Sequence, residues 1–345
     1  MDVSLFDYDL PVELIAQHPT RKRDQSRLMI LDRSTGELRI KPFRHIIDYL
    51  SGGDALVVNQ TKVFKARLFG RRPTGGKVEI FLVRPTELGS QKTWEALVHP
   101  SRRVKEGERV LFDNEPVDLL HDVGGGRWLI GFNSDSQCRR IISRFGHVPL
   151  PHYIKREDQP SDIRRYQTVF ADEEHVGAVA APTAGFHFTR PVVNALTDLG
   201  VRVIRLCLHV GPGTFKPVKV QDIDDHVVDP ELAELNSTAA SELNRVRGSK
   251  GRVFAVGTTS VRTLESAPIS GGLIEPFAGM VDLYIKPGYR FDVVDRLLTN
   301  FHLPKSSLLI LVSAFCGREL ILEAYREAIR QRMRFYSYGD AMLIL

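Results

Sequence analysis

The stretch from Ala66 to about Phe132 constrains the fold most, because nearly every segment in it is typical of a short strand. The strand-like runs are ARLFG, KVEIFLV, TWEALV, ERVLF and RWLIGF, and they are separated by the turn signals TGG, HPS, KEGE and VGGG. Turn signals that recur at strand-length intervals are typical of a small antiparallel barrel or sandwich. The sequence therefore predicts an all-β unit within the chain.

The sequence on both sides of this unit mixes strands and helices. Strands are predicted at LMILD, ELRI, ALVVN, VRVIRLCLHV and RVFAV, the last two buried. Helices are predicted near HIIDYL and at SQCRRIISRFG, PELAELNSTAASELNRV (with Pro230 in its first turn) and RELILEAYREAIRQRMRF. Such a mixture predicts an α/β domain. Because 345 residues are too many for one typical core, the all-β unit is expected to be an insertion in it.

The start of the chain and its cysteines indicate in which cellular compartment the protein is expected to work. The start MDVSLFDYDLP is acidic where a signal peptide is basic, and no apolar run reaches the roughly 18 residues of a membrane span. Cys138, Cys207 and Cys316 are far apart and odd in number. This pattern favours a reducing cytoplasm and argues against a disulfide framework or a structural zinc site.

The net charge of +5 is modest, but basic residues gather in clusters. The clusters are Arg21–Arg23, Arg71–Arg72, Arg102–Lys105, Arg164–Arg165 and Arg326–Arg334. Any one of them can be a solvated face. Together they favour a phosphate-bearing partner, and nucleic acid is the leading candidate.

The sequence has no common nucleotide-binding, zinc-protease or nucleophile-elbow motif. Two glycine-containing segments are the remaining candidates for ligand binding. HVGPGTF at 209–215 is typical of a strand that ends in a tight turn. In AVGTTSVRTLES a strand ends at Gly257 and a helix can open near Val261. The hydroxyl residues between them can bind a polar or anionic ligand, or one of them can simply cap the helix.

Four histidines lie beside apolar residues at the expected edges of loops: His187, His209, His226 and His302. They are candidates for general acids or bases. A histidine beside apolar residues is also commonly a core residue, and the spacing matches no common zinc pattern. His187 raises a particular question, because it lies between two phenylalanines directly after a Thr-Ala-Gly turn.

Long strings of the chain resemble the S-adenosylmethionine:tRNA ribosyltransferase-isomerases of queuosine biosynthesis. The resemblance runs from near residue 6 to the C-terminus and includes FDYDLP, LIAQHP, SRLMILD, DALVVNQTKVFKARLFG, GGKVEIFL, PLPHYIKR, RYQTVFA, GAVAAPTAGFHFT, LHVGPGTFKPV, VGTTSVRTLES, IKPGYRFDVVDRLLTNFHLPKSSLLILVSAFCG and FYSYGDAML. It implies an α/β-barrel-like main domain, expected at 1–61 and 150–345, with a small antiparallel β-barrel inserted at 62–149.

The resemblance also implies a reaction. S-adenosylmethionine would give its ribosyl group to the aminomethyl arm of a 7-deazaguanine at the tRNA wobble position, leaving an epoxycyclopentanediol on the tRNA and releasing adenine and methionine. S-adenosylmethionine would be a consumed substrate, so no cofactor and no metal are expected. The other expectations are binding to the tRNA anticodon arm, no membrane, the cytoplasm and a monomer.

Such a reaction needs a base to remove a proton beside the sulfonium and an acid to protonate the leaving adenine. The candidate catalytic residues are His187, His209, His226, His302 and Glu231. The candidate substrate-binding residues are Asn59, Arg67, Arg165, Tyr166, Gln167, Thr183, Gly185, Phe188, Gly211, Gly213, Thr258, Thr259, Ser260, Arg262, Asn300 and Asp340. In this hypothesis the turn at Gly185 brings the backbone to a ligand, the phenyl rings form an apolar wall and His187 relays a proton.

One segment departs from the family pattern, which is similar to His-x-Met-His-x-Glu. His226 and Glu231 match it, but Val228 and Asp229 take the places of the methionine and the second histidine. This chain has no second histidine at that place, and His226 is therefore the preferred candidate. An RNA-binding module without catalysis and a metal-dependent hydrolase built on the four histidines are the two alternatives.

Overall fold

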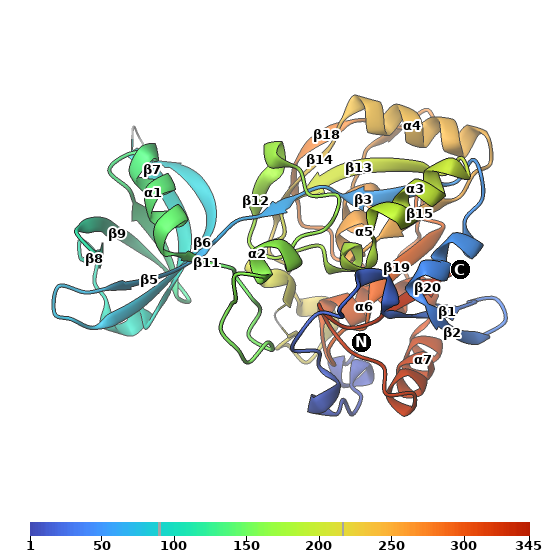
Figure 1. Cartoon of the computed structure of the whole chain (residues 1–345), viewed down its shortest axis with the longest axis horizontal. Coiled ribbons are helices and arrows are strands. Elements are labelled where there is room, and N and C mark those ends of the chain that lie inside the picture. Colours follow the sequence, from blue (N-terminus) through green and yellow to red (C-terminus); the bar gives the residue numbers. More distant parts are fainter. Residues whose placement is uncertain (89–90, 216) are drawn as a thin grey trace.

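The computed structural model describes residues 1–88, 91–215 and 217–345. A large domain is built on a mixed sheet, and a smaller β-barrel projects from one side of it (Figure 1). The predicted fold class, α/β with an inserted small antiparallel β-barrel, is confirmed. The main domain, expected to be barrel-like, is built on a sheet whose two described edge strands do not pair with each other. No helix among the described residues is long and apolar enough to cross a membrane.

The large domain is centred on a nine-stranded sheet. In sheet order its strands are β18 (Phe277–Val281), β14 (Glu231–Leu235), β13 (Arg202–Leu208), β3 (Ala55–Asn59), β15 (Val253–Val256), β19 (Arg296–Asn300), β20 (Ala341–Ile344), β1 (Arg27–Leu31) and β2 (Leu38–Pro42). Strands β13, β3, β15 and β19 pair in parallel. Their carboxyl ends therefore meet at one edge of the sheet.

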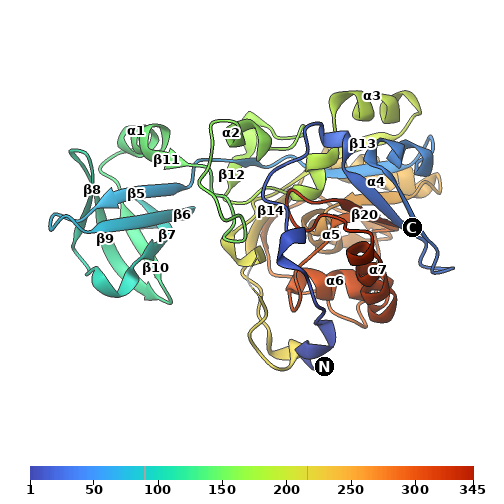
Figure 2. The same cartoon turned by 60° about the horizontal axis from the view of Figure 1, so that its bottom comes forward.

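Helices cover both faces at the centre of this sheet, because central strands such as β3, β15 and β20 are apolar and buried on both sides. In β3, Val57 faces one core with Leu243 and Leu309, whereas Leu56 faces the other with Phe43 and Leu196. The first core is completed by α4 (Ser237–Gly248), α5 (Thr258–Glu265), α6 (Ser307–Cys316) and α7 (Arg318–Arg330), and the second by α3 (Arg190–Asp198) and the 3-10 helix η4 (Phe43–Tyr49). Figure 2 shows α3 on one side of the sheet and α6 and α7 on the other.

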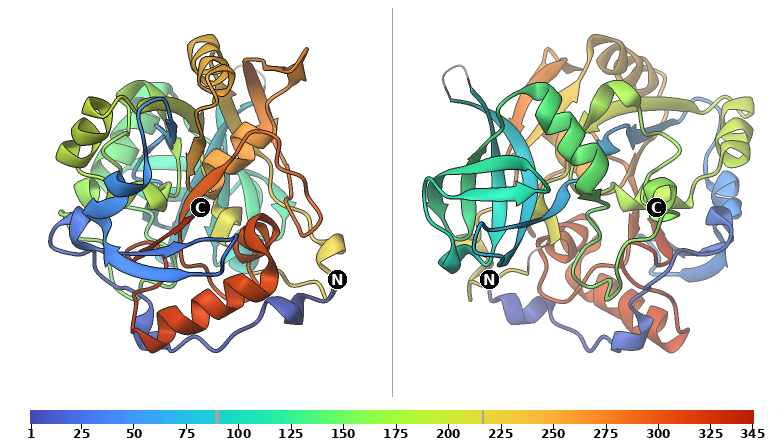
Figure 3. Two further views of the ribbon diagram at one scale, coloured as in Figure 1. Left: turned by 90° about the vertical axis from the view of Figure 1, so that its right-hand side faces the viewer. Right: turned by 60° about the vertical axis from the view of Figure 1, so that its left-hand side comes forward.

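The inserted barrel has a core of its own around Trp128 and Phe112. Its strands are β5 (Arg67–Arg71), β6 (Lys77–Leu88), β7 (Gln91–His99), β10 (Arg127–Gly131), β9 (Glu115–Gly124) and β8 (Arg109–Phe112), and pairing of β5 with β8 closes the barrel. Helix α1 (Asp135–Phe145) packs beside it and leads into β11 (Gly146–His147), which pairs with β5 (Figure 3). Strand β4 (Lys62–Val63) still pairs with β12 (Val176–Ala178) of the large domain, so the boundaries at 62 and 149 stay a prediction.

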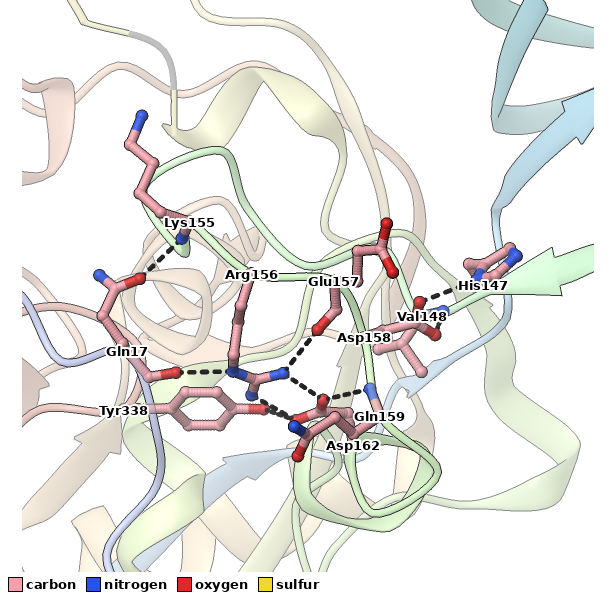
Figure 4. Close-up of polar contacts among 10 residues, drawn as sticks. All are labelled: Gln17, His147, Val148, Lys155, Arg156, Glu157, Asp158, Gln159, Asp162 and Tyr338. Atoms are coloured by element: carbon pink, nitrogen blue, oxygen red, sulfur yellow. Dashed lines mark hydrogen bonds and ion pairs between the residues drawn. The ribbon is translucent and has the colours of Figure 1, made fainter. Parts of the chain in front are cut away.

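A hydrogen-bond network anchors the segment that returns from the barrel (Figure 4). The guanidinium of Arg156 donates to both carboxylate oxygens of Asp162, at 2.6 and 2.9 Å, and the hydroxyl of Tyr338 donates to the same carboxylate at 2.9 Å. Asp162 is buried and begins the short helix α2 (Asp162–Arg165). The network therefore fixes the position of Arg164 and Arg165.

The predicted helix from Pro230 is wrong in its first third. Residues 231–235 form strand β14, with Glu231, Ala233 and Leu235 buried and the residues between them exposed. That alternation has the period of a strand. Helix α4 begins at Ser237, where the side chain of Asn236 accepts a hydrogen bond from the backbone N–H of Ala239. The segment near HIIDYL is a 3-10 helix.

Candidate active site

A pocket lies where the parallel strands of the sheet end. It contains about 450 Å³ of open space. Its lining at or after the ends of β13, β15 and β19 is Val210, Gly257–Thr259 and Thr299–His302, and Ala181–Ala184, Thr214, Leu308, Tyr336 and Ser337 complete it. Ligands of α/β sheets bind at the carboxyl ends of strands. This strand-end pocket is therefore the candidate active site.

A second pocket adjoins the strand-end pocket and shares Thr214 and Leu308 with it. It contains about 660 Å³ of open space. Much of its lining is apolar or aromatic: Val227, Val228, Leu283, Tyr284, Ile285 and Leu311. We call it the apolar pocket, although His226, Asp229 and Arg262 also line it. The two pockets together therefore offer an extended ligand two ends of unlike character.

A buried ion pair between Glu231 and Arg262 lies beside both pockets. One oxygen of Glu231 accepts from the backbone N–H of Gly211 and from the hydroxyl of Thr214, each at 2.7 Å, and the other pairs with Arg262. Arg262 also donates to the backbone carbonyls of Val281 and Leu283, at 3.0 and 3.1 Å. The pair thus ties α5 to β14 and to the loop that carries Thr214.

His226 lines the apolar pocket and is half-buried, with its ring edge-on to that of Tyr284 at 5.3 Å between centroids. Burial lowers the pKa of His226, and the nearby carboxylate of Asp229 opposes that shift. A partly exposed imidazole of this kind can take up and release protons near neutrality.

Asp229 contacts the barrel. Arg127 on β10 donates to its carboxylate at 2.8 Å, across a sequence separation of 102 residues. A Cβ placed on Gly213 would lie 2.2 Å from an oxygen of Asp229, so this glycine lets the pocket loop approach the carboxylate. Asp229 therefore joins the barrel to the wall of the apolar pocket.

His302 lines the strand-end pocket but is buried. A hydrogen bond of 2.9 Å joins its Nε2 to the hydroxyl of Thr299. Burial lowers the pKa of His302 to about 3. It is therefore neutral near pH 7 and can present a hydrogen-bonding ring to a ligand.

His187 lies in a chain of buried hydrogen bonds. Ser26 donates to the carbonyl of Arg23 at 3.0 Å, so Nδ1 of His187 is the donor in its 2.7 Å bond to Ser26. Nε2 accepts from the amide of Asn300 at 3.2 Å, and the amide oxygen of Asn300 accepts from Thr183 at 2.9 Å. Burial, with Arg23 and Arg334 nearby, lowers the pKa of His187 to about 3. The chain connects a neutral His187 to the strand-end pocket through Asn300.

His209 lies apart from these pockets. A hydrogen bond of 2.7 Å joins its Nδ1 to the hydroxyl of Thr61, and its ring packs so closely on Gly177 that a Cβ there would lie 2.8 Å away. Burial lowers the pKa of His209, and His175 lowers it further. The four histidines thus differ in burial and in hydrogen-bond partners, and His226 is the least buried of them.

The structure brings some predicted site residues to the pockets and not others. Thr183, Thr258, Thr259 and Asn300 line the strand-end pocket, and Gly213 and Arg262 line the apolar pocket. Among the residues that the structure describes, the linings of these two pockets do not include Asn59, Arg67, Gly185, Phe188, Gly211, Ser260 or Asp340.

These remaining residues have structural partners. The hydroxyl of Ser260 donates to the carbonyl of Val256 at 2.8 Å, and Phe188 packs in the core against Phe43. At Gly185, where the hypothesis brings the backbone to a ligand, the side chain of Thr168 lies 2.8 Å from where a Cβ would be. Asn59 bonds to Leu208, Arg67 pairs with Glu79, Gly211 bonds to Glu231, and Asp340 bonds to Arg27 and Arg334.

Sequence reasoning missed Thr299, Tyr336 and Ser337 in the strand-end pocket and Tyr284 in the apolar pocket. The string FYSYGDAML held two of them, but a short irregular segment has no period that shows which side chains face a site. Among the described residues, no three His, Cys, Asp or Glu side chains gather as metal ligands.

A wider groove lies at the base of the barrel and contains about 1840 Å³ of open space. Its cations are Arg23, Lys62, Lys65, Arg164, Arg165 and Arg190, and its carboxylates are Asp162 and Glu173. Both carboxylates are paired, Asp162 with Arg156 and Glu173 with Lys62, so this basic groove carries excess positive charge.

The basic groove continues toward the strand-end pocket. Arg23 and Arg165 also line a small cavity with His187 and Ser337, and Ser337 in turn lines the strand-end pocket. Arg165 donates to the backbone carbonyls of Thr20 and Arg21, whereas Arg164 and Arg190 are exposed. The sequence-predicted residues Tyr166 and Gln167 line the groove as well.

Comparison with known proteins gives one consistent family. Residues 3–344 match the family described as "Queuosine biosynthesis protein". The chain is 46% identical to an S-adenosylmethionine:tRNA ribosyltransferase-isomerase of Trichlorobacter lovleyi and 48% identical to one of Carboxydothermus hydrogenoformans, each over 100% of both chains. It is similar to the crystal structure of an S-adenosylmethionine tRNA ribosyltransferase from Thermotoga maritima, with a TM-score of 0.56 and 36% identity over 99% of this chain and 100% of that one.

Proposed function

The chain belongs to the family of queuosine biosynthesis proteins, and from this premise we propose how its pockets serve an S-adenosylmethionine:tRNA ribosyltransferase-isomerase. The enzyme transfers and isomerises the ribosyl group of S-adenosylmethionine onto 7-aminomethyl-7-deazaguanine at the tRNA wobble position. The products are epoxyqueuosine-tRNA, adenine and methionine. S-adenosylmethionine is consumed as a substrate, so the proposal needs no separate cofactor.

One observation carries the placement of S-adenosylmethionine: two pockets of unlike character adjoin at Thr214 and Leu308. Adenine is a flat aromatic ring system whose faces can pack on apolar and aromatic side chains, and we place it in the apolar pocket beside Tyr284. The ribosyl group then lies at the junction and the methionyl end in the strand-end pocket. This places the glycosidic bond close to His226, which lines the adenine side.

In this arrangement His226 exchanges protons with the substrate. Protonated, it donates to adenine as the glycosidic bond breaks. Neutral His302 and the chain through Asn300 supply fixed hydrogen-bonding groups on the methionyl side. Glu231 and Arg262 act as positioning residues, because both side chains are buried and each is held by three hydrogen bonds within the protein.

The proposed function has a direct test. Purified protein is incubated with S-adenosylmethionine and tRNA that carries the 7-aminomethyl-7-deazaguanine base, and the products are separated by chromatography. Adenine and methionine should appear in equal amounts, with and without EDTA. Methyl transfer without free adenine would contradict the proposal, loss of turnover in EDTA with recovery in zinc would favour a hydrolase, and tRNA binding without turnover would favour a simple RNA-binding module.

The departure from the family pattern gives a further prediction. His226→Ala should lower turnover at least tenfold, or about 1.4 kcal/mol of transition-state stabilisation. Asp229→Asn should cost little at saturating substrate, because a part-exposed ion pair contributes at most about 1 kcal/mol. Rates measured from about pH 5 to pH 9 should show a limb that His226→Ala removes and Asp229→Asn keeps. The reverse pattern would assign proton transfer to Asp229.

We propose that the basic groove binds the phosphates of the tRNA anticodon arm, since it leads toward the strand-end pocket along Arg165 and Ser337. The exposed groups Arg164 and Arg190 can contact phosphate directly, whereas Arg165 is held by backbone carbonyls. We also propose that the enzyme acts as a monomer in the cytoplasm, where its tRNA substrate is found.

Binding measured against salt tests this surface. Each phosphate contact adds about 0.7–0.9 to the slope of log affinity against log salt. Arg164→Ala should reduce the slope by about that amount, and the same change at Arg245, which is exposed on α4 outside the groove, should leave the slope unchanged. Equal slopes for wild type and Arg164→Ala would remove Arg164 from the tRNA surface.

A further inference from the structure

The amino end of helix α5 opens into the strand-end pocket. Gly257, Thr258 and Thr259 all line this pocket, and no side chain in the described part of the chain caps the helix. The first N–H groups of a helix have no acceptor within it. Gly257 precedes them with a φ of +89°, a conformation that favours glycine. Backbone donors with a partial positive charge therefore face this pocket.

The hydroxyl of Thr259 is a second, independent observation. Thr259 is only 6% exposed, and its Oγ1 has no hydrogen-bond partner among the residues that the structure describes. The oxygen lies 3.6 Å from where a Cβ on Gly257 would be, and both Gly257 and Thr259 line the strand-end pocket. A buried hydroxyl without a partner is unfavourable unless a ligand supplies one.

The charge of the surroundings indicates the kind of ligand. Among its described lining residues the strand-end pocket has no Asp, Glu, Lys or Arg. Its one titratable imidazole, that of His302, is neutral because burial lowers its pKa to about 3. The helix terminus thus supplies the local positive potential, and a small oxyanion is the ligand that such a terminus binds.

We propose that the amino end of α5, with the hydroxyl of Thr259, binds the α-carboxylate of S-adenosylmethionine. This rests on the proposed function and deepens it, because it fixes which end of the substrate enters which pocket. With the carboxylate at α5, the sulfonium lies toward Thr214 and Leu308, and adenine lies in the apolar pocket next to His226. A tRNA phosphate is the other oxyanion that could occupy the terminus.

The test compares S-adenosylmethionine with its decarboxylated analogue, which keeps the sulfonium, ribose and adenine. Both are titrated by calorimetry into wild type and Thr259→Val in the presence of substrate tRNA whose aminomethyl group is acetylated, so that binding is read without turnover. The matched control is Thr263→Val, a buried threonine one turn further along α5 and outside the pocket. Hydrogen bonds to charged groups predict that wild type binds the analogue about 10- to 100-fold more weakly than S-adenosylmethionine.

Thr259→Val should weaken S-adenosylmethionine about tenfold and leave the analogue unchanged, and Thr263→Val should affect both ligands alike. Equal affinity of wild type for the two ligands would overturn the proposal. A loss of tRNA affinity in Thr259→Val, with S-adenosylmethionine binding intact, would assign the terminus to a phosphate and also overturn it. Adenine release by wild type on unmodified substrate tests the proposed function separately, so the two failures are distinguishable.

Discussion

Glu231→Ala is expected to destabilise the large domain by about 3–5 kcal/mol and to lower adenine release at least 100-fold. Removing one partner of a buried ion pair leaves the other charge without compensation. Arg262 would remain buried, and the N–H of Gly211 and the hydroxyl of Thr214 would lose their acceptor. The loop shared by the two pockets would then lose its position. Urea unfolding followed by circular dichroism, with adenine release on the same preparation, measures both effects.

The control for this prediction lies on the same strand. Glu234 is exposed on β14, three positions from Glu231 and on the opposite face of the strand. Glu234→Ala should change the unfolding free energy by less than about 0.5 kcal/mol, as surface substitutions usually do. If Glu231→Ala behaved like Glu234→Ala, the ion pair would not be what holds the pocket loop.

Stability is expected to fall as pH drops below about 6.5, the ordinary pKa of an unfolded histidine. Burial lowers the pKa of both His187 and His302 to about 3 in the folded protein. Above pH 6.5 neither state binds the two protons, and between 6.5 and 3 only the unfolded state does. Each histidine then removes about 1.4 kcal/mol per pH unit, so the pair lowers stability by about 4 kcal/mol at pH 5.

Urea unfolding at pH 7.5, 6, 5.5 and 5 measures this slope. This pH range lies above the range in which paired carboxylates begin to take up protons. Asp162 is an example: burial raises its pKa, but hydrogen bonds, including those from the Arg156 guanidinium, bring it below the ordinary value. His187→Gln should remove about 2 kcal/mol of the loss at pH 5, and His18→Gln, at an exposed position, should leave the loss unchanged. Constant stability from pH 7.5 to 5 would mean that the two imidazoles are protonated in the folded protein.

Local sequence patterns predict much of this fold, because several elements have one dominant pattern. The apolar runs that become β3 and β15 are buried on both faces, and the turn signals between the barrel strands set their lengths. The sequence predicts a helix at 231–235 because these residue types suit a helix, whereas the alternation of buried and exposed residues is that of a strand. The period-two pattern of this segment indicates a strand, whereas its composition favours a helix.

The candidate site was less predictable, because its geometry depends on residues that are distant in sequence. His187 has the local sequence of an exposed turn, yet Ser26 and Asn300, which are 161 and 113 positions away, hold it in the interior. Thr258 and Thr259 could be singled out because a strand end followed by a helix start is a local signal. Which hydroxyl faces the pocket and which, like that of Ser260, bonds back to the helix depends on the packing around α5.

The contact between Arg127 and Asp229 has a mechanical consequence. The chain enters and leaves the barrel through adjacent segments, since a Cβ on Gly146 would lie only 2.7 Å from the carbonyl oxygen of Lys65. Two neighbouring attachments define an axis, and the ion pair is a separate point of attachment. Any rotation of the barrel about that axis must either break the ion pair or pull on the loop at Asp229. Because Gly213 packs directly on that carboxylate, a torque on the barrel displaces the wall of the apolar pocket.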